Sequence, residues 1–198
     1  MKYFLSTLII MFYSGIALTA EHEPSVLIAY HSLSGNTETM AKAIYEGVSS
    51  VEGVNVKIMK IKDIQKEEIL SADAIIVGSP VHNANITPAV QRFINRWPFK
   101  GQPLQNKIGA AFVTAGGISA GEEIALMNIL HSMLIYNMIV VGGAGWTSAF
   151  GASAIVEEPP FDALDEKNEV SVQFLDKGKA LGKRVATLTK RFSNLPTN

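Results

Sequence analysis

The loop at residues 31–37, HSLSGNT, combines small hydroxyl side chains with a glycine and contains no lysine or arginine. It follows a short apolar run and precedes a stretch whose apolar spacing predicts a helix. A helix start has unpaired N–H groups and about half a positive charge from the helix dipole. Gly35 allows close approach of the backbone, and further donors come from Ser32, Ser34, Asn36 and Thr37. The loop therefore predicts an anion site without formal charge, with an ordinary capped turn as the alternative.

Two known phosphate-binding patterns are absent from this loop, and their absence restricts the kind of anion that it could bind. It has no Gly-Lys-Ser/Thr, which a Walker A loop needs for a triphosphate, and it is not the dinucleotide pattern GxGxxG. ATP chemistry is therefore not expected. A loop without lysine suits a monophosphate that is held and not transferred.

A second polar loop follows the apolar run at residues 72–80 and reads GSPVHNANIT. It is long enough to wrap one side of a flat ligand. His82 and Asn83 are candidates for contact with a ring or its substituents. The alternative is that His82 is an ordinary surface residue.

A third loop, TAGGISAGEE, contains Gly-x-Ser-x-Gly with Ser119 at its centre, the pattern of the nucleophile elbow of α/β hydrolases. Those enzymes place an acid and then a histidine after the serine. No histidine follows His131, which is expected on the apolar face of the next helix. We therefore predict no catalytic residue here, and instead either a flexible small-residue loop or one whose N–H groups face a ligand ring.

The last glycine-rich segment, residues 142–152, contains Trp146 and Phe150. Aromatic side chains beside a cleft can form a lid or stack on a planar ligand. The alternative is that both residues pack the segment against the protein.

Apolar runs and helical patterns alternate along the chain and predict the elements that position these loops. Strands are expected at residues 25–30, 54–61, 72–80, 107–115 and 138–146, and helices at residues 37–51, 66–70, 88–97, 124–134 and 168–191. Parallel strands joined by right-handed helical crossovers form an open sheet covered by helices on both faces. Ligands of such folds bind at the carboxyl ends of the strands, where these loops lie.

Composition restricts the function further. The 198 residues carry a net charge of −1 with 47% hydrophobic residues, which predicts one domain, at residues 25–192, and no nucleic-acid partner. The chain has no cysteine. Its four histidines have no close metal-ligand spacing, so no metal site is expected.

Residues 1–20 differ from the rest, with Lys2 as the only charge before a short apolar run and small residues. This is typical of a secretory signal peptide, cleaved near Ala17 or Ala20. An uncleaved anchor is the alternative. The pattern predicts export, to the periplasm or another compartment outside the cytoplasm, with no stable membrane insertion of the mature domain.

With these loops in this order, the chain resembles flavodoxin-like FMN proteins, in particular WrbA-like NAD(P)H:quinone oxidoreductases and NADPH-dependent FMN reductases. Residues 32–37 are similar to the family's phosphate loop, Ser/Thr-x-Ser/Thr-Gly-x-Thr. The resemblance places the second and third loops beside the isoalloxazine ring, through Pro80, Val81, His82, Asn83, Thr114, Ala115, Gly116 and Gly117.

The resemblance implies a flavodoxin-like three-layer sandwich with a five-stranded parallel sheet. It also implies FMN as cofactor, NADH or NADPH as co-substrate, a quinone-like acceptor and a homodimer or homotetramer. The cofactor carries such chemistry, and no protein acid or base is required. The alternative is a flavodoxin-type electron carrier, although carriers are usually strongly acidic and this chain has 17 basic and 18 acidic residues.

Overall fold

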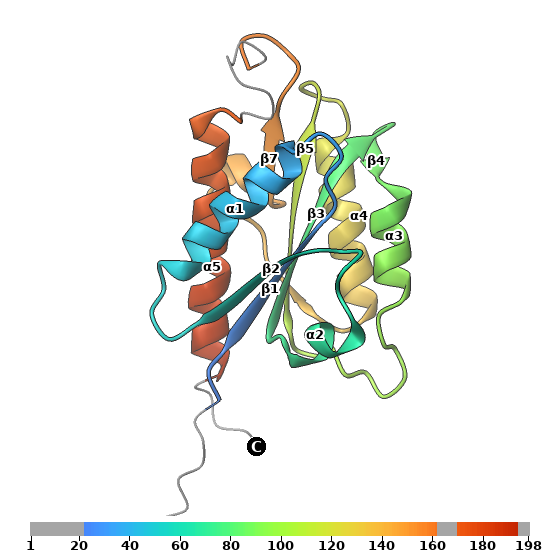
Figure 1. Cartoon of the computed structure of the whole chain (residues 1–198), viewed down its shortest axis with the longest axis vertical. Helices are drawn as coiled ribbons and strands as arrows, with labels where there is room; N and C mark the ends of the chain where they lie inside the picture. The colour runs from blue at the N-terminus through green and yellow to red at the C-terminus, as the bar shows by residue number, and fades with distance from the viewer. Residues whose placement is uncertain (1–21, 162–169, 194–198) are drawn as a thin grey trace, which may run out of the picture.

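The computed structural model describes residues 22–161 and 170–193 and forms a sheet between two layers of helices (Figure 1). Its strands are β1 (Ser25–Tyr30), β2 (Asn55–Lys60), β3 (Ala74–His82), β4 (Asn85–Ile86), β5 (Ile108–Ala115), β6 (Ile139–Val140) and β7 (Ala152–Ile155). Its helices are α1 (Asn36–Ser49), α2 (Lys66–Ser71), α3 (Pro88–Asn95), α4 (Glu122–Ile135), α5 (Val172–Ser193) and the 3₁₀ turn η1 (Trp146–Ser148).

The strand order is β2-β1-β3-β5-β6, and every neighbouring pair along this path is parallel. This confirms the predicted α/β sandwich with a parallel sheet. One antiparallel strand was not predicted: β4 pairs with the end of β3 as a short hairpin. The order reverses between β1 and β3, so this is where a ligand crevice is expected in a doubly wound sheet.

The fifth parallel strand is divided, which corrects the predicted strand at residues 138–146. β6 pairs with the start of β5 and β7 pairs with its end, so residues 141–151 form an excursion between the two halves. Gly142 and Gly143 permit it because a Cβ at either position would overlap Ala149 or Ser148 of the returning segment. The segment with Trp146 and Phe150 therefore lies between the two halves of the edge strand, and not at its carboxyl end. The loop at the carboxyl end of this strand begins instead at Val156.

Each face of the sheet has its own apolar core. On one face α1 and α5 pack together, and on the other lie α3 and α4 (Figure 1). Met40, Ile44 and Leu181 are fully buried in the first core, as Phe93 and Ile129 are in the second. These cores fix the strand ends on which the loops are mounted.

Some predictions fall outside the described residues. The signal peptide at residues 1–20 and the first two residues of the predicted final helix are among them; α5 itself begins at Val172. Among the residues that the structure describes, no helix is both long and apolar enough to span a membrane.

Candidate functional site

The first loop ends in the geometry of an open helix start. Gly35 is the N-cap of α1 with φ 102°, and no side chain caps this helix. The N–H groups of the first turn are thus available at the positive end of the helix dipole. A positive φ of this size is accessible to glycine and strained for most other residues. The backbone here has the form that an anion site requires.

The hydroxyl side chains of this loop have different surroundings. Ser32 Oγ accepts a hydrogen bond from the Gly35 N–H at 3.1 Å, which closes the loop on itself. Ser34 is exposed and Asn36 is half-buried at the first position of α1. The loop therefore presents Ser34 and Asn36 outward, while Ser32 also maintains its shape.

Thr37 turns inward and not toward the surface. Its side chain is buried, and its hydroxyl lies 2.7 Å from the hydroxyl of Thr114, itself buried near the end of β5. β3 lies between β1 and β5 in the sheet, so this hydrogen bond joins the first loop to the third across the position of β3. Thr37 contributes its backbone N–H to the helix start, while its hydroxyl holds the two loops in register.

The second loop is a continuation of β3 into a hairpin. Pro80, Val81 and His82 belong to β3, and the chain reverses at Asn83 and Ala84, which have φ values of 50° and 59°. Val81 pairs with Ile86 in β4. His82 and Asn83 are exposed at the tip.

Several hydrogen bonds make this hairpin a firm wall. The Thr87 N–H donates to Ser79 Oγ at 3.1 Å, and the Asn128 side-chain amide donates to Asn85 Oδ1 at 2.8 Å. The tip also lies close against Gly121, where a Cβ would overlap Ala84. The second loop is thus attached to α4 and to the end of the third loop.

The third loop lies against a segment that the sequence analysis did not consider. The Glu157 N–H donates to the Gly116 carbonyl at 3.0 Å, and Glu158 Oε2 accepts from the Ile118 N–H at 2.5 Å. A Cβ at Gly117 would lie 2.8 Å from Glu158 Oε2. Ala115 is buried, whereas both glycines are half-buried. Glu157 and Glu158 were missed because the fifth strand was placed too early; the apolar run ASAIV before them was the available signal.

Ser119 has φ 59°, but the described residues around it do not form a hydrolase site. Its N–H donates to Glu122 Oε1 at 3.1 Å. No hydrogen bond joins its hydroxyl to a histidine within residues 22–161 and 170–193. Nor do those residues contain a group of three or more His, Asp or Glu side chains that could hold a metal.

A cavity of about 540 Å³ adjoins the first loop on the side of β2 and α3. Its polar lining includes His31 and Ser32 from the loop and four cations that the sequence analysis did not single out: Lys60, Lys62, Arg92 and Arg96. The available signal was the i, i+4 spacing of the two arginines, which places them on one face of a helix. The site thus has an open helix start at its centre and a basic cavity beside it.

Comparisons with known proteins agree with this geometry. The family model described as NADPH-dependent FMN reductase matches residues 64–153, which include the second and third loops. A protein named flavodoxin from Clostridium saccharobutylicum is 36% identical over 118 residues, covering 60% of this chain and 72% of the relative. A protein named NAD(P)H dehydrogenase (quinone) from Acidithiobacillus ferrooxidans is 27% identical over 195 residues, covering 84% of this chain and 97% of the relative.

The fold has a solved counterpart. A crystal structure described as a flavodoxin, WrbA-like protein, from Agrobacterium tumefaciens superposes with a TM-score of 0.67 at 18% identity. It covers 85% of this chain and 98% of its own.

Proposed function

Because this chain belongs to the flavodoxin-like family of FMN proteins, we propose that it is an FMN-dependent oxidoreductase that takes electrons from NADH or NADPH and passes them to a quinone or a similar acceptor. The observation that carries this proposal is the near full-length match to a relative named NAD(P)H dehydrogenase (quinone). The convergence of three loops at one edge of the sheet supports it.

The residues of this edge fit FMN. The uncapped start of α1 behind Gly35 offers N–H donors at a positive helix end, which suits a phosphate. The phosphate would be held by Ser34, Asn36 and the backbone of residues 32–37. When bound, FMN supplies the capacity to accept a hydride and to release electrons one or two at a time.

The other two loops would hold the flat ring. The hairpin tip at His82 and Asn83 forms one wall and is fixed to α4 by Asn85. Gly116 and Gly117 form the other, with the carboxylates of Glu157 and Glu158 beside them. The Thr37–Thr114 hydrogen bond keeps this wall at a constant distance from the phosphate loop. These residues bind and orient, and none needs to transfer a proton.

A second candidate is an electron carrier of the flavodoxin type. It is favoured by relatives named flavodoxin, 33–36% identical to this chain, whose match is stronger per residue than that of the quinone dehydrogenases. Against it stands the near balance of 17 basic and 18 acidic residues, because carriers that dock to redox partners usually have a marked charge bias.

One preparation distinguishes these candidates. The purified chain is incubated with FMN, and its visible spectrum and retained flavin are recorded. NADH and NADPH oxidation are then followed with and without a benzoquinone. Retained FMN with quinone-dependent oxidation of either donor is the expected result. Retained FMN without oxidation of either donor identifies a carrier, and no retained flavin contradicts both candidates.

We also propose a homodimer or homotetramer. Several large apolar side chains on α4 and in the segment after β6 are exposed, and Trp146 is 91% exposed. Others are Ile124, Leu134, Ile135 and Phe150. Apolar patches of this kind commonly mark contacts between proteins. Light scattering on the purified chain measures the assembly directly.

Export stays a proposal that rests on residues 1–20 alone. Expression of the full chain in a bacterium with cell fractionation and mass spectrometry of the mature N-terminus tests it. A mature chain that begins after Ala17 or Ala20 and is found outside the cytoplasm is expected.

A further inference from the structure

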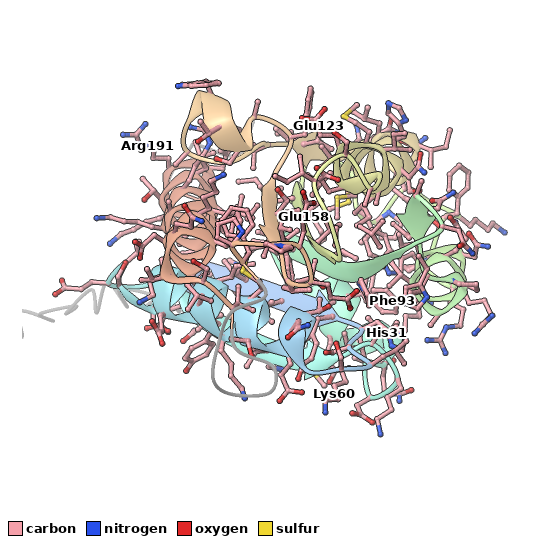
Figure 2. All side chains as sticks on the ribbon, turned by 90° about the horizontal axis from the view of Figure 1, so that it is seen from above. His31, Lys60, Phe93, Glu123, Glu158 and Arg191 are labelled. Atoms are coloured by element: carbon pink, nitrogen blue, oxygen red, sulfur yellow. The ribbon has the colours of Figure 1, made fainter. Side chains whose placement is uncertain are left out.

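The basic cavity lies between the carboxyl ends of β1 and β2 and the surface of α3. Its volume is about 540 Å³, and its apolar lining comes from the Tyr30 side chain, Ile61 and Ala89. Figure 2 looks down on this end of the molecule and shows His31 and Lys60 on the same side as Phe93 of α3. The cavity thus has space and apolar surface for an organic ring, not only for an ion.

Some of the cations around this cavity form ion pairs within the protein, and others do not. Lys60 forms an ion pair with Glu38 at 3.1 Å, and Glu38 also pairs with Lys42 at 3.3 Å. Lys62, Arg92 and Arg96 form no ion pair with any residue that the structure describes. Three cations in one lining therefore have no anionic partner from the described chain, and that is a condition for binding an anion.

The two arginines are rigidly mounted. α3 begins at Pro88 and is capped by Thr87, whose Oγ1 accepts the Val90 N–H at 3.4 Å. Phe93 and Ile94 are buried beneath the helix. Arg92 lies on this helix, Arg96 is its C-cap residue one turn later, and both line the same cavity. Guanidinium groups bind phosphate with two parallel hydrogen bonds and also stack on flat rings.

His31 connects the cavity to the proposed flavin site. The pKa of His31 is lowered, first by burial and then by electrostatic repulsion from His82 and Arg92. His82 is at the tip of the second loop and Arg92 is in the cavity, so both lie within electrostatic reach of one imidazole. Ser32 likewise belongs to both the cavity lining and the first loop. A ligand in the cavity would therefore lie directly beside the flavin-binding loops.

We propose that this basic cavity binds the phosphorylated adenosine end of the nicotinamide donor. This rests on the proposed function. The adenine ring packs on the apolar lining, and the phosphate of the adenosine end is held by Arg92, Arg96 and Lys62. NADPH differs from NADH by a 2′-phosphate on its adenosine. Because three cations without ion-pair partners bind this additional phosphate, the chain prefers NADPH to NADH.

The first measurement is direct binding, without turnover. Calorimetry compares 2′,5′-ADP, 5′-AMP and adenosine on the FMN-loaded chain, and again on an R92Q/R96Q variant that removes the two arginines of the cavity. The matched control is R184Q/R191Q, which removes two exposed arginines of α5. We expect the bisphosphate to bind most tightly and to lose about tenfold or more in affinity in R92Q/R96Q, with no change in the control.

The second measurement identifies the source of the phosphate. In steady-state assays R92Q/R96Q should raise the KM for NADPH about tenfold or more, raise the KM for NADH by a smaller factor and leave kcat nearly unchanged. If 2′,5′-ADP affinity falls but the NADPH KM does not, a free nucleotide is the ligand and the donor assignment is wrong. Equal 2′,5′-ADP affinity in the variant and the original chain overturns the proposal. If the original chain oxidises neither donor, the proposed function fails, and the donor assignment fails with it; calorimetry then still shows whether the cavity binds an adenosine phosphate.

Discussion

Two charged regions flank the three loops proposed to hold FMN, and they differ in what their charges do. On one side is the basic cavity; on the other is an acidic rim formed by Glu122, Glu157 and Glu158. Figure 2 shows His31 and Lys60 at one side, Glu158 nearer the middle and Glu123 at the opposite side. One carboxylate oxygen of Glu122 and one of Glu158 accept hydrogen bonds from backbone N–H groups of the third loop. By contrast, Lys62, Arg92 and Arg96 have no ion pair within the described residues.

This difference separates structural charges from charges that are available to a ligand. A carboxylate that accepts a hydrogen bond from a backbone N–H of its own chain stabilises a loop, because that N–H would otherwise have no partner in the protein. A guanidinium without a partner contributes little to folding and much to anion binding. Mutations in the acidic rim should therefore change the stability of the protein. Mutations in the basic cavity should change its affinity for an anionic ligand.

The largest effect is expected where the rim meets the hairpin. Gly121→Ala introduces a Cβ at φ +100° that overlaps Ala84. The left-handed backbone costs about 1–2 kcal/mol for a non-glycine residue, and the overlap roughly 1–3 kcal/mol more. Urea denaturation should show the combined loss of unfolding free energy.

The matched control for that variant is Gly101→Ala. Gly101 has φ +80° with no atom within 4 Å of the added Cβ, so it reports the backbone cost alone. Equal losses in the two variants would mean that the hairpin tip does not pack on Gly121 in solution.

The next effect concerns the hydrogen bond that joins the first and third loops. Thr37→Val leaves the buried Thr114 hydroxyl without its partner at 2.7 Å. A buried polar group left unpaired costs about 1–3 kcal/mol. Chemical denaturation measures this loss, and FMN affinity should fall with it.

The double variant Thr37→Val/Thr114→Val is the control, because removal of both hydroxyls leaves no unpaired group. Its stability should lie close to that of the original chain. Additive losses in the double variant would show that the two hydroxyls do not interact.

A smaller effect distinguishes the two charged regions directly. Glu158→Gln weakens the acceptor of the Ile118 N–H and should lower the unfolding free energy by roughly 0.5–1.5 kcal/mol. Arg92→Gln should change it by less than about 0.5 kcal/mol, as is usual for exposed side chains without specific contacts. Thermal unfolding of both variants tests the comparison, and a larger loss for Arg92→Gln would reverse the roles assigned to the two regions.

Much of this arrangement could be predicted from the sequence because the pattern of buried strands is strong. Apolar runs such as VLIAY and AIIVG occur in sheet strands buried on both faces. They predicted both ends of β1, the ends of β5 to within one residue and the ends of β3 to within two. The first loop was located from its position between the first of these strands and an amphipathic helix, and its role in binding a phosphate stays a prediction. These are local features, and local features can be read from one sequence.

What the sequence did not predict depends on distant contacts. The split of the fifth strand requires β5 to pair with two separate segments, which no local pattern specifies. The inward turn of Thr37 depends on Thr114, 77 residues later. The basic cavity combines residues of β1, of the segment after β2 and of α3, and its cations look like ordinary surface charges until the fold brings them together.

The smallest effect should come from His31. Burial and its positive neighbours lower its pKa from the ordinary value of 6.5, so the unfolded chain binds more protons than the folded chain as the pH falls below that value. Stability from this residue is therefore fully present above pH 6.5 and is lost as the pH falls through the folded pKa. His31→Gln should flatten this part of the profile of stability against pH.

A ligand phosphate in the cavity should raise the pKa of His31, because a nearby anion favours the charged imidazole. NMR titration of the imidazole with and without 2′,5′-ADP should therefore show a pKa that begins below 6.5 and rises on binding. A pKa that does not respond to the ligand would place the phosphate away from His31 and would remove the link between the basic cavity and the loops proposed to hold FMN.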